Sequence, residues 1–245
     1  MKKFELTSEF ITNVFGVKLF RIRALIEFGD VEVGDKGGFV EKEENLSQDG
    51  NAWVYGDAWV SDNARVSGDA RVSDNAWVSD NAEVYGNAWV SGDARVSDNA
   101  RVSDNARVSG DARVSDNARV SGDARVSGNA EVSGDAEVSD NARVSGDAEV
   151  YGNAWVSGDA RVSGNADYAM VKGFGRFHRN TTFFRCKDGK IRVVCGCFLG
   201  DLDEFRKKVK ETHGDGKMAK EYLAIADLME MHFCEEKDGY GEGHK

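Results

Sequence analysis

Between Asn51 and Gly164, apolar and polar positions follow one another with a strict period of six residues. The period repeats nineteen times without an insertion and reads Asn/Asp–Ala–x–Val–Ser/Tyr–Gly/Asp. Alanine fills the second position and valine the fourth position of each copy. In a β-strand, residues two positions apart point to the same face, so this spacing predicts a short strand with one apolar side. The residue between them then points outward.

The polar half of each repeat predicts a tight corner, because Ser, Gly, Asp and Asn favour turns. Gly and Asn tolerate a positive φ, so we expect the Gly or the Asn of each junction to enter the left-handed region. A strand this short cannot fold alone. Three repeats therefore predict a three-sided coil of eighteen residues, in which each strand pairs in parallel with the strand one coil away. The interior of such a coil contains only Val and Ala.

The spacing resembles the hexapeptide-repeat family, in which an aliphatic residue is followed four positions later by a small one. Val54 and Ala58 fit this pattern, and the match continues as far as Val156 and Ala160. The resemblance implies the family's fold, a left-handed parallel β-helix, and places the chain in the mainly β class. The acyltransferases of that family act as trimers, so the resemblance also implies a homo-oligomer.

The flanking sequence predicts four regions. Residues 1–30 are expected to form an N-terminal cap, because an open solenoid end exposes unpaired backbone groups. The solenoid is expected over 31–168, where a degenerate first coil precedes the perfect repeats and Tyr168 takes the place of a valine. A small α+β domain follows over 169–233, and 234–245 is expected to be a flexible tail.

The region after the repeats predicts a ββαα arrangement. A hairpin is expected over 182–197, around the turn Lys-Asp-Gly-Lys. A first helix is expected from a capping box at Asp201 to a stop at Gly214. A second helix is expected over about 217–233, where apolar residues recur at helical spacing.

The net charge of −11 lies mainly in the repeats, where ten Arg face nineteen Asp and Glu and no Lys occurs. This acidity favours solubility, with an acidic mimic of nucleic acid as the alternative. It argues against binding nucleic acid directly, because a phosphate backbone requires net positive charge. Neither a secretory leader nor a membrane-spanning run is visible, so we expect a cytoplasmic protein with four reduced cysteines and no membrane partner.

Three segments resemble hexapeptide-repeat proteins encoded by phages and prophages: RALIEFGDVEVGDKGGFVEKEENLS (23–47), FFRCKDGKIRVVCGCF (183–198) and AKEYLAIADLMEMHF (219–233). The resemblance implies a viral protein of unknown function. The compartment would then be the host cytoplasm, with a part in the virion as the alternative.

Catalytic chemistry finds little support in the sequence. The hexapeptide-repeat resemblance makes an acyltransferase the alternative function, but the repeats contain no histidine to act as a general base. His178, just beyond them, is the one candidate, and its plainer interpretation is a loop histidine. Cys195 and Cys197 with Cys186, Cys234 or His213 would make a zinc site of unusual spacing, and buried free thiols are the simpler interpretation. We expect no catalytic residue, no metal and no cofactor.

The outward residues fall into three columns that repeat every coil. One column is Trp53, Arg71, Trp89, Arg107, Arg125, Arg143 and Arg161, the second is Trp59, Trp77, Arg95, Arg113, Glu131 and Glu149, and the third is Arg65, Glu83, Arg101, Arg119, Glu137 and Trp155. Arg71 is expected to stack between two Trp rings, and Arg113 is expected to pair with Glu131. Four stacked arginines from Arg107 onward need relief from the corner aspartates or burial against a sister chain.

Four of the five tryptophans lie in the first seven repeats, on two adjacent columns. One interpretation is that they only stabilise the sheet surface by stacking. The other is a protein interface, for which exposed aromatic residues bordered by Arg are typical. The candidate interface residues are Trp53, Trp59, Trp77, Trp89, Arg71 and Arg107. The sequence therefore favours a non-enzymatic solenoid that acts as a structural or protein–protein interaction module. Its partner would be a host protein, including a defence protein, or a second copy in a homo-oligomer.

Overall fold

The computed structural model describes residues 1–176 and 178–234 of the chain, which divides into two compact units. The first unit runs from Met1 to Tyr168, and the second begins at Ala169. Of the predicted flexible tail, all but Cys234 lies outside the described residues.

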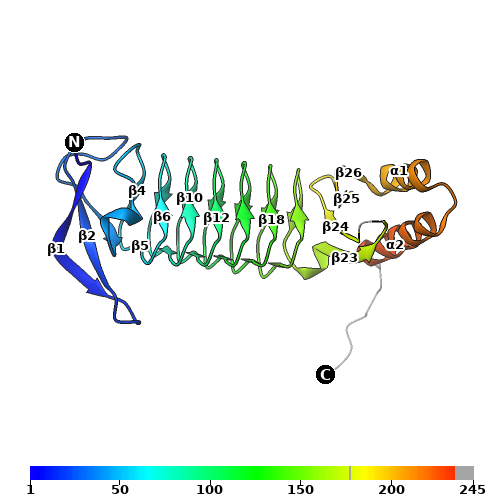
Figure 1. Cartoon of the computed structure of the whole chain (residues 1–245), viewed down its shortest axis with the longest axis horizontal. Coiled ribbons are helices and arrows are strands. Elements are labelled where there is room, and N and C mark those ends of the chain that lie inside the picture. The colour runs from blue at the N-terminus through cyan, green and yellow to red at the C-terminus, as the bar shows by residue number, and fades with distance from the viewer. Residues whose placement is uncertain (177, 235–245) are drawn as a thin grey trace, which may run out of the picture. The chain divides into compact units, whose positions relative to one another are not determined.

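The first unit is a β-solenoid of stacked coils (Figure 1). Its repeats form two-residue strands: β4 (Trp53–Val54), β5 (Trp59–Val60), β6 (Arg65–Val66), β7 (Arg71–Val72), β8 (Trp77–Val78), β9 (Glu83–Val84), β10 (Trp89–Val90), β11 (Arg95–Val96), β12 (Arg101–Val102), β13 (Arg107–Val108), β14 (Arg113–Val114), β15 (Arg119–Val120), β16 (Arg125–Val126), β17 (Glu131–Val132), β18 (Glu137–Val138), β19 (Arg143–Val144), β20 (Glu149–Val150), β21 (Trp155–Val156) and β22 (Arg161–Val162). Strands three apart pair in parallel, with partners 18 residues apart, as in Trp59 and Trp77. The predicted coil of three repeats is confirmed, while its handedness stays a prediction.

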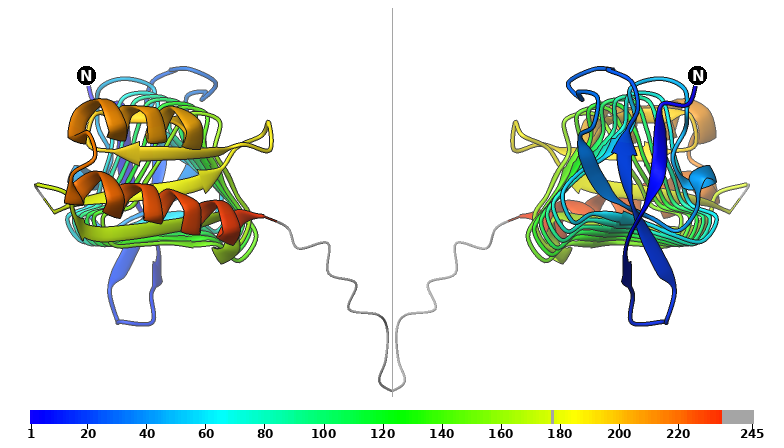
Figure 2. Two further views of the ribbon diagram at one scale, coloured as in Figure 1. Left: turned by 90° about the vertical axis from the view of Figure 1, so that its right-hand side faces the viewer. Right: turned by 90° about the vertical axis from the view of Figure 1, so that its left-hand side faces the viewer.

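Three parallel sheets form the sides of the solenoid, and its stacked coils superimpose when viewed along the axis (Figure 2). Sheet I contains β4, β7, β10, β13, β16, β19 and β22; sheet II contains β5, β8, β11, β14, β17 and β20; and sheet III contains β6, β9, β12, β15, β18 and β21. The side chains between Ala and Val form the three predicted columns, in register from strand to strand. Each column can therefore act as a continuous surface.

The interior of the solenoid consists of the repeated alanines and valines. From Ala52 to Val162 these side chains are at most 1% exposed. Burial of apolar surface on three sides stabilises coils whose strands are too short to be stable singly. The interior has no space for a side chain larger than that of alanine at these positions, so a larger residue there would overpack the coil.

The corners differ from the prediction in one respect. From Gly56 to Gly158, the residue with positive φ is the sixth of each repeat, and it is Gly or Asp; the Asn that follows an Asp does not take this role. Asp98, for example, has a φ of 60° and accepts a hydrogen bond through Oδ2 from the backbone N–H of Asp116 in the next coil. This bond to the neighbouring coil offsets the strain of a left-handed aspartate, which periodicity alone did not reveal.

The first residue of each repeat stacks on its equivalents in adjacent coils. Asn63 Nδ2 donates to Asn81 Oδ1 at 3.3 Å, and Asn117 Nδ2 donates to Asp135 Oδ1 at 3.0 Å. An amide is both donor and acceptor, so a run of such residues continues the pairing of the coils outside the backbone. These ladders of hydrogen bonds link the corner side chains of successive coils along the solenoid axis.

The N-terminal residues close one end of the solenoid. β1 (Phe4–Thr12) and β2 (Lys18–Ala24) form an antiparallel hairpin, and β2 pairs with β3 (Lys36–Val40). β3 pairs in parallel with β5, and the short 3₁₀-helix η1 (Glu43–Asn45) follows it. The hairpin thereby joins sheet II, and its far end extends past the outline of the coils (Figure 2).

A second 3₁₀-helix, η2 (Asn165–Asp167), ends the first unit, and a four-stranded antiparallel sheet opens the second. Its strands are β23 (Tyr168–Phe174), β24 (Arg179–Arg185), β25 (Ile191–Cys195) and β26 (Phe198–Asp201), in that order. The predicted hairpin is β24–β25, and the two predicted helices follow it; β23 and β26 add one strand on either side of the hairpin. Gly175 and Gly196, which both have positive φ, lie in the turns that lead to these two extra strands.

Two helices complete the second unit: α1 (Leu202–His213) and α2 (Lys217–Phe233). The predicted capping box is present, since Asp201 Oδ1 accepts from the N–H of Glu204 at 3.0 Å and Glu204 Oε2 accepts from the N–H of Asp201 at 2.8 Å. Phe205 and Tyr222 pack with Phe183 of the sheet in one core. Among the described residues, neither helix combines the length and apolarity that crossing a bilayer requires.

Candidate binding surface

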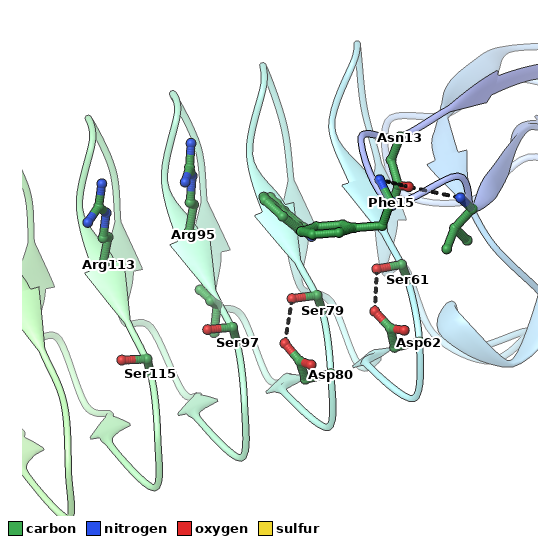
Figure 3. A pocket seen from close by; sticks show the side chains of 13 residues that line it. Asn13, Phe15, Ser61, Asp62, Ser79, Asp80, Arg95, Ser97, Arg113 and Ser115 are labelled. Carbon is green, nitrogen blue, oxygen red and sulfur yellow. Dashed lines mark hydrogen bonds between the residues drawn. The ribbon is translucent and has the colours of Figure 1, made fainter.

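A groove of about 610 Å³ opens between the tip of the β1–β2 hairpin and the outer face of sheet II (Figure 3). Phe15 and Val17 line it on the hairpin side, and Trp77, Arg95 and Arg113 line it on the sheet side. The groove combines aromatic, basic and hydroxyl groups within one unit of the molecule. Such a mixture is typical of sites that bind peptides and other amphipathic ligands.

The hairpin tip is held by a compact set of hydrogen bonds. Asn13 Oδ1 accepts from the backbone N–H of Phe15 at 3.0 Å and from that of Val17 at 2.9 Å. Gly16 has a φ of 83°, which the turn requires and which glycine adopts without strain. These constraints direct Phe15 toward the sheet, where its ring centre lies 6.2 Å from that of Trp77.

The tip exposes an unusual amount of apolar surface. Val14 is 90% exposed and Phe15 is 74% exposed, and Phe10 and Ile11 of β1 are exposed as well. An isolated exposed apolar side chain needs no explanation, but four on one hairpin do. We name Phe10, Ile11, Val14 and Phe15 the hairpin-tip patch.

The floor of the groove is a stack of aromatic and cationic groups. The rings of Trp59 and Trp77 stack with their centres 4.1 Å apart at an angle of 19°. The Arg95 guanidinium lies over the other face of Trp77, 5.5 Å from the ring centre. Arg113, one coil further, forms the predicted ion pair with Glu131 at 3.1 Å. The floor is therefore apolar near the hairpin and charged away from it.

A row of hydroxyl and carboxylate groups borders the same groove. Ser61 Oγ donates to Asp62 Oδ2 at 2.8 Å, and Ser79 Oγ donates to Asp80 Oδ2 at 2.9 Å. The indole Nε1 of Trp77 is buried without a hydrogen-bond partner among the described residues. An unsatisfied buried donor is costly.

The structure places only some of the predicted interface residues at the surface. Trp77 lines the groove and Trp59 stacks on its ring. Trp89 is 41% exposed on sheet I, with Arg107 over its ring at 5.7 Å. Trp53 was wrongly predicted to be exposed, since it is 1% exposed. Phe4 and Phe28 of the N-terminal region cover it with ring centres at 6.1 and 5.3 Å.

Arg71 also differs from its prediction. It is in register between Trp53 and Trp89, but its guanidinium forms an ion pair with Asp30 at 3.1 Å. Asp30 also accepts a hydrogen bond from Tyr55 Oη, and burial together with this carboxylate raises the pKa of Tyr55 to about 12. Arg71 therefore anchors the N-terminal region to sheet I.

The hairpin-tip patch, Arg95 and Arg113 were missed as site residues. The sequence places these two arginines in the correct outward column. It does not mark them as site residues, because nothing in the repeat distinguishes one coil from another. The sequence Asn13-Val-Phe-Gly16 was the available signal, since a turn with two large apolar residues is unusual.

The candidate catalytic and metal residues are dispersed. His178 is exposed, with Nδ1 3.0 Å from the carbonyl oxygen of Gly173. Cys186 is buried, whereas Cys197 and Cys234 are exposed, and Cys195 Sγ accepts from Thr181 Oγ1. Among residues 1–176 and 178–234, no three metal-ligating side chains gather into a cluster.

The fold defines the class of this molecule, a β-solenoid repeat protein. Within that class, the repeats are similar to the family described as YdcK Beta solenoid repeat, which matches residues 64–80, 94–110, 100–116, 106–122, 112–128 and 118–134. No curated protein matches the chain. The similarity covers coils of the solenoid and does not include the hairpin-tip patch.

Proposed function

We propose that this protein is a non-enzymatic interaction module that binds a protein partner through the groove and the hairpin-tip patch. The observation that carries the proposal is the exposed Phe15, which is fixed by the Asn13 turn directly above the Trp77–Arg95 stack. Buried aromatic and arginine side chains dominate the binding energy of protein interfaces. The rigid solenoid keeps these groups in place, so little entropy is lost on binding.

The composition of the groove indicates the chemistry of the bound segment. An apolar side chain of the partner would fill the space beside Phe15 and Val17. A carboxylate of the partner would reach Arg95, whose guanidinium is exposed on one side and stacked on Trp77 on the other. An extended segment with an apolar residue followed by an acidic one fits this order best.

We also propose that the protein has no catalytic activity. It is supported by the repeats, which contain no histidine, and by His178, which is exposed and close to a backbone carbonyl. If the protein were instead an acyltransferase, it would bind an acyl-CoA, and His178→Ala would abolish its activity. We expect calorimetry with acetyl-CoA to detect no binding.

We further propose that the protein acts in a phage or prophage setting. The resemblance of segments 23–47, 183–198 and 219–233 to phage and prophage proteins supports a viral protein that acts on a host protein. A defence protein is one such partner, and the host cytoplasm is the corresponding compartment, with a part in the virion as the alternative. Expression of the chain in host cells under phage challenge tests this part separately.

Site-specific photo-crosslinking tests the proposed interface. A photoreactive phenylalanine replaces Phe15 in one sample and Val33 in the other, because Val33 is 67% exposed on the same unit but lies outside the groove. We expect position 15 to give a partner adduct in at least tenfold higher yield. Equal yields at the two positions, or adducts from Val33 alone, would contradict the proposal.

A further inference from the structure

Sheet I carries a column of four arginines without an acidic partner. Arg107, Arg125, Arg143 and Arg161 are in register on β13, β16, β19 and β22. The first three are exposed, and Arg161 is half-buried. Among the described residues, none of the four forms an ion pair with a carboxylate. We name these four residues the arginine column.

On each of the other two sheets, one arginine of the column forms an ion pair with a glutamate of a neighbouring coil. Arg101 forms an ion pair with Glu83 at 3.3 Å on sheet III, and Arg113 pairs with Glu131 at 3.1 Å on sheet II. Among the described residues, no corner aspartate forms an ion pair with the arginine column. Asp104, Asp123 and Asp147 accept hydrogen bonds from a backbone N–H or from asparagine instead. Repulsion from Arg161 and Arg125, together with partial desolvation, lowers the pKa of Arg143. The column is thus a run of uncompensated positive charge.

An acidic row of the same length lies on the solenoid corner that joins sheets II and III. Its members are Asp62, Asp80, Asp98 and Asp116, which are all exposed and all have positive φ. Their hydrogen bonds to serine hydroxyls and backbone N–H groups use the Oδ2 atom. Within residues 1–176 and 178–234, the Oδ1 atom of each carboxylate has no donor and can accept from an outside one. We name these four residues the aspartate row.

The two charge sets match in spacing and are placed on opposite sides. Members of each set are 18 residues apart and therefore one coil apart, which is about 4.8 Å for neighbouring strands. In a three-sided coil, the corner between sheets II and III faces away from sheet I. The aspartate row starts nearer the N-terminal end, and the arginine column ends nearer the C-terminal end.

We propose that the arginine column of one copy docks on the aspartate row of a second copy. A rigid period shared by both partners lets several guanidinium–carboxylate pairs form together, in a geometry that suits paired N–H donors. An acidic ligand with a different spacing would engage fewer of the arginines at once. The contact uses sheet I and a corner. Asp62 and Asp80 of the aspartate row also border the groove, whereas Asp98 and Asp116 do not.

The two surfaces are different, so the contact is heterologous. Each copy presents one arginine column and one aspartate row, and a bound copy still has one of each to offer. Such an interface propagates into rows of rods unless a ring closes. Exposed ion pairs are screened by salt, so association should be strong only at low ionic strength.

Sedimentation equilibrium of the full chain tests the contact. We expect the average mass to exceed the monomer mass and to rise with concentration in about 0.01 M salt, and to return to monomer in about 1 M salt. Two double variants remove one surface each: Arg125→Gln with Arg143→Gln, and Asp98→Asn with Asp116→Asn. Asparagine tolerates positive φ and keeps an acceptor oxygen, so the coils stay intact.

Mixing the two double variants gives the sharpest outcome. Each alone has one intact surface and should stay monomeric, whereas the mixture should form a complex limited to one copy of each. Arg101→Gln with Arg119→Gln, on sheet III, is the matched control and should associate at least tenfold more tightly than either variant.

Several results would overturn the inference. A wild-type protein that stays monomeric in about 0.01 M salt has no such contact. Association that survives in both double variants, or a mixture without a complex, would place the contact elsewhere. If the wild type is monomeric but binds a single-stranded oligonucleotide and Arg125→Gln with Arg143→Gln abolishes that binding, the column is a nucleic-acid surface. Loss of the hairpin-tip partner would leave each of these results unchanged, because Asp98, Asp116 and the arginine column do not line the groove.

Discussion

The carboxylate of Asp116 accepts a hydrogen bond from the backbone N–H of Gly134, one coil further along the solenoid, at 2.9 Å. Asp116 has a φ of 57°, in the region that glycine adopts with least strain. Five other sixth-position aspartates make the same bond: Asp74, Asp80, Asp98, Asp104 and Asp140. Asp and Gly therefore occupy this position for different reasons: Asp makes a hydrogen bond between coils, and Gly adopts the positive φ without strain.

Substitutions of Asp116 separate these two effects. Asp116→Gly removes the bond but also relieves the left-handed strain, so we expect the free energy of unfolding to change by less than about 1 kcal/mol. Asp116→Ala removes the bond and keeps the strain, and the loss should be about 1–2 kcal/mol. Asp111→Ala, at the first position of a repeat, is the control and should change stability little. Chemical denaturation measures the order, and an alanine variant as stable as the glycine variant would refute the account of the corner.

The interior should tolerate no growth at the alanine positions. Ala106 is completely buried, and Ala106→Leu should lower the free energy of unfolding by about 1–3 kcal/mol because the larger side chain overpacks the coil. The adjacent Arg107→Leu points outward and should be close to neutral. Thermal unfolding of both variants checks this, and equal stability would mean that the interior contains space.

The arginine column should reduce stability at low salt. Arg143→Gln removes a charge that is repelled by Arg161 and Arg125, so the denaturation midpoint should rise. Arg113→Gln breaks the ion pair with Glu131, so its midpoint should fall. Both changes should shrink as salt is added, because these side chains are exposed. Shifts of the same sign in the two variants would show that like-charge repulsion is not the cause.

Lys3 gives the N-terminal cap a pH dependence. Its ammonium is buried and donates to the carbonyl oxygen of Ala52 at 2.9 Å, and burial lowers its pKa from 10.5 to about 8. Below pH 8 the folded state carries the full penalty of the buried charge. Between pH 8 and 10.5 the folded protein gives up this proton while the unfolded chain keeps it, so stability rises with pH.

The wild type should gain about 2 kcal/mol of unfolding free energy between pH 8 and 10. Lys3→Met should lose most of that gain, whereas Lys2→Met should keep it, because Lys2 is exposed. Measurements stop at pH 10 because Tyr55, whose pKa is raised to about 12, begins to act in the opposite direction above its ordinary value of 10. A pH profile identical in Lys3→Met and wild type would show that the ammonium is not desolvated.

The repeat dictated most of the architecture in advance. Val and Ala two positions apart fixed the interior, and the period fixed which outward residues meet, as in Arg113 and Glu131. The wrong predictions concern residues that are in contact with segments far away in the sequence. Trp53 is indistinguishable from Trp89 within its repeat and is buried only because Phe4 and Phe28 fold over it.

The groove could not be derived for the same reason. It forms where Phe15, far away in the sequence, is brought against Trp77 by the pairing of β2 with β3 and of β3 with β5. Local patterns predict which face of a strand is buried, but not which face a neighbouring hairpin covers. The choice of Asp over Asn for positive φ depends likewise on a bond to the next coil, which a single repeat does not show.

The central claim is that the hairpin-tip patch and the groove bind a protein partner. The most direct measurement is the affinity of the crosslinked partner, once purified, for the wild type and for Phe15→Ser with Arg95→Ser, by calorimetry. We predict an affinity at least tenfold weaker for this double variant and an unchanged affinity for Met231→Ser, which alters an exposed side chain of the second unit. An affinity that is the same for all three proteins would contradict the claim.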